Sequence, residues 1–178
     1  MESLKGNYKD YPIFLETGLF EGHTILAMEP LFPTLFTVEI KEKYYHDVKT
    51  RYSGEKINFI LGDSSYVFET LLPTLDEPVI FFLDGHWSSG STGRSEKDCP
   101  LYEEMTHIKN LFKQNAIIIV DDYRLFGLGP NVSKEICNWE DIEKTRLLDI
   151  IKDRVTDVYH LPSELHPEDR LIIHIKSM

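Results

Sequence analysis

The sequence has few features of a secreted or membrane protein. Of its 178 residues only two are cysteines, Cys99 and Cys137, and their spacing fits neither a disulfide framework nor a zinc site. Free thiols suit an intracellular compartment. No apolar run approaches the roughly 20 residues that span a bilayer, and the opening MESLKGNYKDYP lacks the apolar core of a signal peptide. We therefore expect a cytoplasmic protein without membrane association.

Basic residues are also scarce. The chain has 19 Lys and Arg against 30 Asp and Glu, a formal net charge of −11 at pH 7. Affinity for nucleic acid comes mainly from Lys and Arg that neutralise phosphates, so a nucleic-acid partner is not expected. The length suits one domain with a sheet covered on both faces, and no repeat appears. We expect residues 1–178 to form this domain, with residues 1–12 as a polar lead-in that packs across the sheet edge or covers a ligand.

Apolar runs alternate with helical patterns along the chain. Strands are predicted at residues 13–15, 34–40, 56–61, 79–83, 116–120, 155–161 and 171–176. Helices are predicted at His23–Phe32, at Lys41–Tyr52, after a Ser64 cap, after Asp98 and Pro100, and at Trp139–Lys152 with Asn138 as its cap. Unbroken runs such as VIFFL indicate central parallel strands. The pattern predicts an α/β fold: a doubly wound, mostly parallel, seven-stranded Rossmann-like sheet with helices on both faces and an antiparallel C-terminal edge hairpin.

The segment IFLETGLFEGHT, residues 13–24, has the pattern of a strand, a glycine turn and a helix start. Gly18 can adopt a positive φ and let a ligand lie against the main chain, and Gly22 can let the helix pack close to the strand. The spacing departs from the dinucleotide fingerprint G-x-G-x-x-G, and such glycines can also form a simple turn. About twenty residues further on, Glu39 ends the next strand, where a carboxylate can bind both hydroxyls of a ribose.

An acid lies at the carboxyl end of every predicted parallel strand. Each one alone can serve as a helix cap or turn former. Parallel strands bring their carboxyl ends to one edge of the sheet, where ligands bind, so the whole set favours a binding site. Its members are Glu16, Glu39, Asp63, Asp84, Asp121 and Asp122.

These residues resemble those of the class I S-adenosylmethionine-dependent methyltransferases, from Ile13 to the terminal hairpin. The resemblance implies that the E-x-G-x-x-x-G turn holds the amino-acid end of the cofactor, that Glu39 binds the ribose, and that Asp63 lies near the adenine. Its implied cofactor-binding set is Glu16, Thr17, Gly18, Gly22, Thr24, Glu39, Asp63, Ser64 and Asp84.

Two further motifs, FFLDGHW and IIIVDDY, resemble those of the metal-dependent O-methyltransferases of the catechol and macrolide-sugar types. This resemblance implies Asp84, Asp121 and Asp122 as ligands of Mg²⁺ or another divalent cation, which would lower the pKa of a substrate hydroxyl. His86 is our candidate base, beside Asp84 in the catalytic set, although it can equally structure the following loop or orient a neighbour. The catechol-type enzymes have a lysine directly after the His-Trp pair, where this chain has Ser88.

The sequence therefore predicts O-methylation of a small hydroxylated acceptor such as a sugar or natural product. The alternatives are a Mg-dependent hydrolase on the same fold and a non-catalytic subunit or scaffold. The chain lacks the N-terminal helices that cover the acceptor in many such enzymes. The acceptor site is then either open, or closed by a second subunit of a homo-oligomer or by the loop Ser88–Arg94. Arg94 and Arg124 can contact the acceptor or remain solvated.

Overall fold

The computed structural model describes all of residues 1–178 and is built on one sheet of seven strands. The strand order is β3-β2-β1-β4-β5-β7-β6. The first five strands are parallel, and β7 runs antiparallel to both β5 and β6, which confirms the predicted fold and terminal hairpin. The strands are β1 (Ile13–Thr17), β2 (Thr34–Glu39), β3 (Ile57–Leu61), β4 (Val79–Leu83), β5 (Ala116–Val120), β6 (Val155–Leu161) and β7 (Arg170–Ile175).

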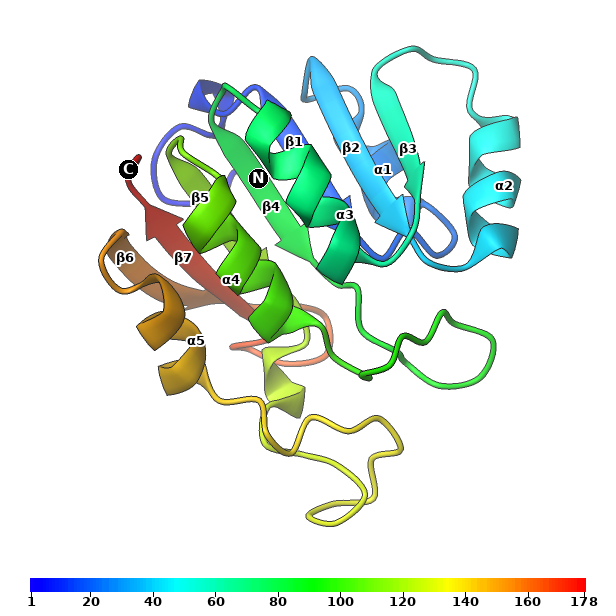
Figure 1. Ribbon diagram of the computed structural model, residues 1–178, viewed down its shortest axis with the longest axis vertical. Coiled ribbons are helices and arrows are strands. Elements are labelled where there is room, and N and C mark those ends of the chain that lie inside the picture. Colours follow the sequence, from blue (N-terminus) through cyan, green and yellow to red (C-terminus); the bar gives the residue numbers. More distant parts are fainter.

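Helices cover both faces of the sheet. Figure 1 shows α3, α4 and α5 in front of the strands, α1 behind them and α2 beside β3. Ile25 of α1 and Val48 of α2 belong to one apolar cluster, separate from the cluster under α4. The arrowheads of β1, β2 and β4 point to the lower edge, where the long loops after β4 and β5 also lie. The helices are α1 (His23–Met28), α2 (Glu42–Arg51), α3 (Ser64–Leu71), α4 (Leu101–Leu111) and α5 (Lys144–Ile151).

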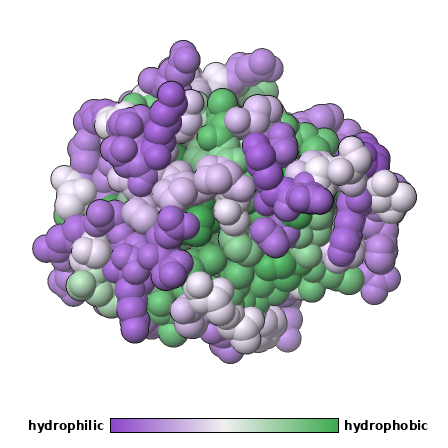
Figure 2. Space-filling view, turned by 90° about the horizontal axis from the view of Figure 1, so that it is seen from above, coloured by the Kyte–Doolittle hydropathy of each residue, from purple (hydrophilic) through white to green (hydrophobic).

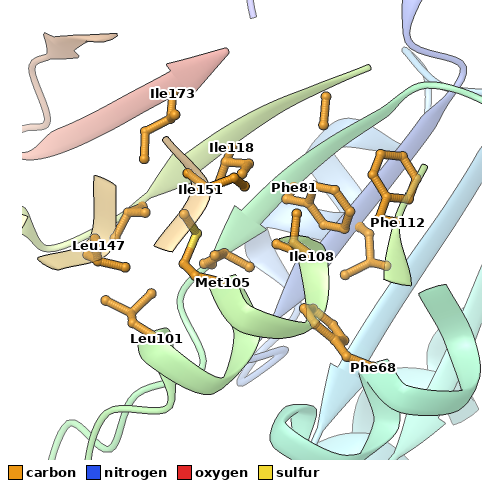
Figure 3. Close-up of a cluster of buried hydrophobic side chains, with 14 of the residues drawn as sticks. Phe68, Phe81, Leu101, Met105, Ile108, Phe112, Ile118, Leu147, Ile151 and Ile173 are labelled. Carbon is orange, nitrogen blue, oxygen red and sulfur yellow. The ribbon is translucent and has the colours of Figure 1, made fainter. Parts of the chain in front are cut away.

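The central strands are fixed by an apolar core. All five residues of β4 and of β5 are buried. On the front face, Met105 and Ile108 of α4 pack over the sheet between Phe68 and Ile151 (Figure 3). Fully burying a side chain of this size contributes roughly 1.5–3 kcal/mol, so the core holds the strand ends at fixed positions.

The predicted helix His23–Phe32 is too long, because α1 ends at Met28. Pro30 has no backbone N–H to donate to the Leu26 carbonyl, so the helical hydrogen bonding ends at Glu29. The predicted end at Phe32 is therefore four residues too late.

The predicted helix Trp139–Lys152 starts too early, because α5 begins at Lys144. The Asn138 side chain does cap a turn, since its Oδ1 accepts the Glu140 N–H at 3.0 Å. The Trp139 N–H, however, donates to the Leu128 carbonyl at 2.8 Å. This pairing holds residues 139–143 in the loop after β5.

Two predicted helix caps are also wrong. Asp63, not Ser64, caps α3, and its Oδ1 accepts the Ser65 N–H at 2.9 Å. Asp98 does not cap α4, because its carboxylate accepts hydrogen bonds from Arg94 Nε at 2.7 Å and Asn138 N at 3.0 Å. Asp98 therefore joins two loops rather than starting a helix.

The N-terminal lead-in packs on the last strands of the sheet rather than on the predicted ligand site. The Lys5 N–H donates to the Tyr159 hydroxyl at 2.8 Å, and Lys5 Nζ pairs with Asp157 at 2.8 Å. Seen from the edge opposite the loops, the surface is mostly hydrophilic with a hydrophobic band between polar side chains (Figure 2). None of the helices combines the length and apolar character needed to cross a membrane.

Candidate functional site

A cavity of about 380 Å³ opens at the carboxyl ends of β1 to β4. This size lies within the range of about 300–1,000 Å³ that is usual for small-molecule sites. Three of the six strand-end acids, Glu39, Asp63 and Asp84, lie in its wall. Predicted residues in its wall are Gly18, Glu39, Asp63, Ser64, Asp84 and His86.

Gly18 lies in the cavity wall, tightly packed against the backbone after β4. Its φ is +85°, and a Cβ atom at this position would overlap the carbonyl of Asp84. Gly18 also donates its N–H to the Val38 carbonyl at 2.9 Å. Glycine is therefore required where the turn after β1 passes the backbone that follows β4, and the role of Gly18 in holding a ligand stays a prediction.

Gly22 and Thr24 do not line this cavity. Gly22 was predicted to let α1 pack close to β1. A Cβ atom on Gly22 would instead come within 2.7 Å of the Val48 side chain, so this glycine permits the close approach of α2. Thr24 borders a second cavity, with Met28 and Phe82, on the other side of the turn. Of the residues in the glycine turn, only Gly18 and Phe20 therefore line the first cavity.

Glu39 is buried in the cavity wall, with 5% of its surface exposed. One carboxylate oxygen accepts the Phe20 N–H at 2.9 Å, and the other accepts the Lys41 N–H at 2.7 Å. These bonds fix the orientation of the carboxylate, and each oxygen keeps a lone pair for a further donor. Glu39 therefore remains competent to bind hydroxyl groups.

The loop after β4 lies across the cavity. Ser91 and the Tyr44 hydroxyl of α2 are hydrogen-bonded at 2.7 Å, and Ser95 donates to the Asp63 carboxylate. A Cβ atom on Gly93 would overlap the Ile40 side chain, so the loop backbone is in close contact with the end of β2. Of the predicted ways to close the site, the structure shows the loop Ser88–Arg94 in contact with it.

Thr17 and Glu16 lie beneath the cavity floor instead of in its wall. The Thr17 hydroxyl accepts the Asp84 N–H at 3.3 Å and so supports the loop after β4. Glu16 is 1% exposed and accepts a hydrogen bond from Thr37 Oγ1 at 2.8 Å. Burial raises the pKa of Glu16 well above its usual range.

Glu104 of α4 is a second buried acid under the floor, and the sequence analysis missed it. It is 0% exposed, and neither oxygen has a partner in hydrogen-bond geometry, although the Thr17 and Ser64 hydroxyls lie beside it. Burial raises the pKa of Glu104 to about 7. The sequence offers one indication of this burial, because Glu104 directly precedes Met105, a residue of the apolar stripe of α4.

At the β5 side of the cavity, His86 links two of the predicted metal ligands. Its Nδ1 lies 3.3 Å from Asp84 Oδ1, and its Nε2 lies 3.0 Å from Asp122 Oδ2. The imidazole is 5% exposed and packs against the Trp139 ring at a centroid distance of 4.8 Å. Oxygen or nitrogen atoms of Asp84, His86 and Asp122 lie within 4.8 Å of one another, so this group could hold a metal ion.

Charge and burial shift the pKa values in this group. Burial raises the pKa of Asp84 to about 7, despite the nearby His86. Burial alone would lower the pKa of His86, but its hydrogen bond to Asp122 and the charge of Asp84 raise it. Burial opposes ionisation of Asp122 as well, yet His86 and Arg124 lower its pKa. The protonation of each of these three groups therefore depends on the charge of the others.

Asp121 belongs to a different group from the one predicted. Its Oδ1 lies 3.4 Å from Arg170 Nε, and it clusters with Asp122 and Asp169. Asp169 is 1% exposed and was not predicted as a site residue. It directly precedes β7, which is antiparallel to β5, so the amino end of β7 lies beside the carboxyl end of β5. Asp122 is shared by both groups.

The two candidate acceptor-binding arginines already have partners. Arg94 stacks over Trp87 at 4.0 Å and pairs with Asp98 at 2.7 Å. Arg124 pairs with Asp122 and, at 2.6 Å, with Asp169. In this arrangement both arginines stabilise loops around the site.

Solved structures resemble this chain in fold but hardly in sequence. A protein of Klebsiella pneumoniae assigned as an O-methyltransferase matches at 13% identity and a TM-score of 0.63, over 96% of this chain and 75% of that one. Human methyltransferase-like protein 13 in complex with SAH matches at 16% identity and 0.60, over 94% and 72%. An rRNA methylase from Streptococcus thermophilus matches at 13% identity and 0.57, over 95% and 89%.

No protein-family model matches the chain, and no curated protein matches it in sequence. The similarity to the solved structures establishes the Rossmann-like fold that they share with this chain. Their acceptors do not transfer with it, because one fold hosts many functions.

Proposed function

We propose that this protein is an S-adenosylmethionine-dependent methyltransferase. The observation that carries the proposal is the wall of the cavity, where the bare backbone of Gly18 faces Asp84 and the Glu39 carboxylate stands at the end of the neighbouring strand. This pairing suits a ligand with an amino-acid end and a ribose. The fold is shared with proteins whose structures contain SAH, which supports the same choice.

The residues present fit this cofactor. Glu39 would accept hydrogen bonds from the ribose hydroxyls, Asp63 and Ser64 would lie near the adenine, and Gly18 would contact the amino-acid end. The excess of carboxylates suits a sulfonium cation. When bound, the cofactor supplies an electrophilic methyl group. The chain itself orients that group and, through the loop Ser88–Arg94, excludes water.

We further propose that the acceptor is a small hydroxylated molecule and that a divalent cation such as Mg²⁺ assists O-methylation. Of the three acids predicted as ligands, Asp84 and Asp122 lie in one group and offer carboxylate oxygens, which are the donors that Mg²⁺ takes, whereas Asp121 lies beside Asp169 and Arg170. A bound cation would lower the pKa of the acceptor hydroxyl. The acceptor would enter beside Asp84 and His86, at the end of the cavity away from Glu39.

Calorimetric titration with S-adenosylmethionine and with SAH tests the cofactor assignment. We expect binding to the wild type, and at least tenfold weaker binding to Glu39→Gln, which loses the charged acceptor of the ribose hydroxyls. Glu42→Gln, an exposed change on α2, is the matched control and should bind as the wild type does. No heat with millimolar cofactor would refute the proposal.

Detection of SAH formed with a panel of sugars and phenols then tests the reaction. Methyl transfer that is lost in Asp122→Asn while cofactor binding is retained would support catalysis at the acidic group. Cofactor binding without turnover on any acceptor would favour the non-catalytic subunit. Phosphate release from generic esters with Mg²⁺, in the absence of cofactor binding, would favour the hydrolase.

A further inference from the structure

We infer that the imidazole of His86 is itself a metal ligand, through Nε2 together with the Asp122 carboxylate, and that Asp84 positions it through Nδ1. The inference rests on the metal site of the proposed function. It changes the donor set from oxygen atoms alone to oxygen and nitrogen. His86 then has a different role from the base that the sequence predicted.

The positions of the donor atoms support this site. Two ligands bound at about 2.1 Å and at right angles around one ion lie about 3 Å apart. His86 Nε2 and Asp122 Oδ2 are 3.0 Å apart, which matches this separation, and an ion bound to both would replace the hydrogen bond between them. Asp121 cannot take the place of His86 in this group, because its carboxylate faces Arg170 and Asp169.

The second ring nitrogen completes the argument. A histidine that binds a metal usually donates its other N–H to a carboxylate, which fixes the tautomer and the ring orientation. Nδ1 of His86 lies 3.3 Å from Asp84 Oδ1. The ring is also held against Trp139 and is almost fully buried, so the imidazole is already oriented for a metal.

A nitrogen ligand changes which metals the site prefers. Mg²⁺ favours oxygen donors and near-ideal octahedral geometry, whereas imidazole suits transition metals such as Zn²⁺ and Fe²⁺. With two carboxylates nearby, Mn²⁺ is a suitable probe of the same site. We expect Mg²⁺ to displace Mn²⁺ only at more than about tenfold excess.

Electron paramagnetic resonance of added Mn²⁺ tests the inference without any assay of turnover. Wild-type protein should bind Mn²⁺ and show the electron spin-echo modulation of a directly bound ¹⁴N nucleus. The modulation should disappear in His86→Gln and remain in His46→Gln, which removes an exposed histidine of α2. In Asp84→Asn the modulation should remain, with Mn²⁺ affinity reduced by about 10- to 100-fold.

Several outcomes would overturn the inference. Bound Mn²⁺ without nitrogen modulation in the wild type would indicate an oxygen-only site and leave His86 as the predicted base. No binding at millimolar Mn²⁺ would remove the metal site altogether. Modulation retained in His86→Gln would point to another histidine. Calorimetry of S-adenosylmethionine on the same samples keeps failure of this inference separate from failure of the cofactor assignment.

Discussion

Glu104 should make the protein less stable as pH rises, and Glu104→Gln should remove that effect. The carboxyl group is fully buried beside Thr17 and Ser64, with the negative charges of Asp63 and Glu103 nearby. A glutamine has almost the same shape and no charge. It therefore changes the ionisation of this position with little change in packing.

The magnitude follows from proton linkage. Burial raises the pKa of Glu104 from an ordinary value of 4.5 to about 7 in the folded protein. Between these two pH values the unfolded chain loses the proton while the folded chain keeps it, so ionisation favours unfolding. Each pKa unit corresponds to about 1.4 kcal/mol, so the folded protein should lose roughly 3 kcal/mol of stability from Glu104 across this window.

Urea denaturation at several pH values between 4.5 and 8 measures the effect. Near pH 4.5 wild type and Glu104→Gln should differ by less than about 1 kcal/mol, because both side chains are then mostly neutral. By pH 8 the variant should be the more stable one by roughly 3 kcal/mol. The difference in unfolding free energy between wild type and Glu69→Gln, an exposed change on α3, should not vary with pH. A constant offset at every pH would refute the reasoning.

Three further predictions concern the backbone, the core and the loop over the cavity. Gly18→Ala should weaken cofactor binding more than about 100-fold, because its Cβ meets the Asp84 carbonyl directly after β4. Gly6→Ala, with nearly the same φ of +84° and open space around it, should cost only about 1 kcal/mol of stability and leave binding unchanged. Arg154→Met should lower the free energy of unfolding by roughly 3 kcal/mol in urea, since this guanidinium donates to four backbone carbonyls; an unchanged midpoint would contradict this. Tyr44→Phe removes the hydrogen bond to Ser91 and should raise the cofactor dissociation rate about fivefold in stopped flow, with no effect expected if the loop does not cover bound cofactor.

The sheet and its edge of acids were predictable because they depend on local patterns. The unbroken runs that became β4 and β5 can be stable only inside, and parallel strands fix where their carboxyl ends lie. The convergence of Glu39, Asp63 and Asp84 on one cavity follows from that topology.

The late start of α5 and the missed acid Asp169 come from contacts between distant segments. Nothing near Trp139 in the sequence reveals its pairing with Leu128, which delays the start of α5. Asp169 lies before a reversed strand and so escaped a search of strand ends. The orientation of His86 between Asp84 and Asp122 depends on two segments, and Asp122 lies 38 positions after Asp84, so no spacing rule gives it.

The division of the site along the chain has an evolutionary consequence. The loops after β1, β2 and β3 build one half of the site. The other half is bordered by residues 126–143, which contain no helix or strand and contact His86 through Trp139. Because Gly127 and Leu128 pair with Trp139 at the base of this insertion, its outer part can lengthen, shorten or change sequence without moving the sheet. Under the proposed function, descendants of this scaffold can thus acquire new acceptors by sequence change in one segment while the cofactor-binding half is inherited intact.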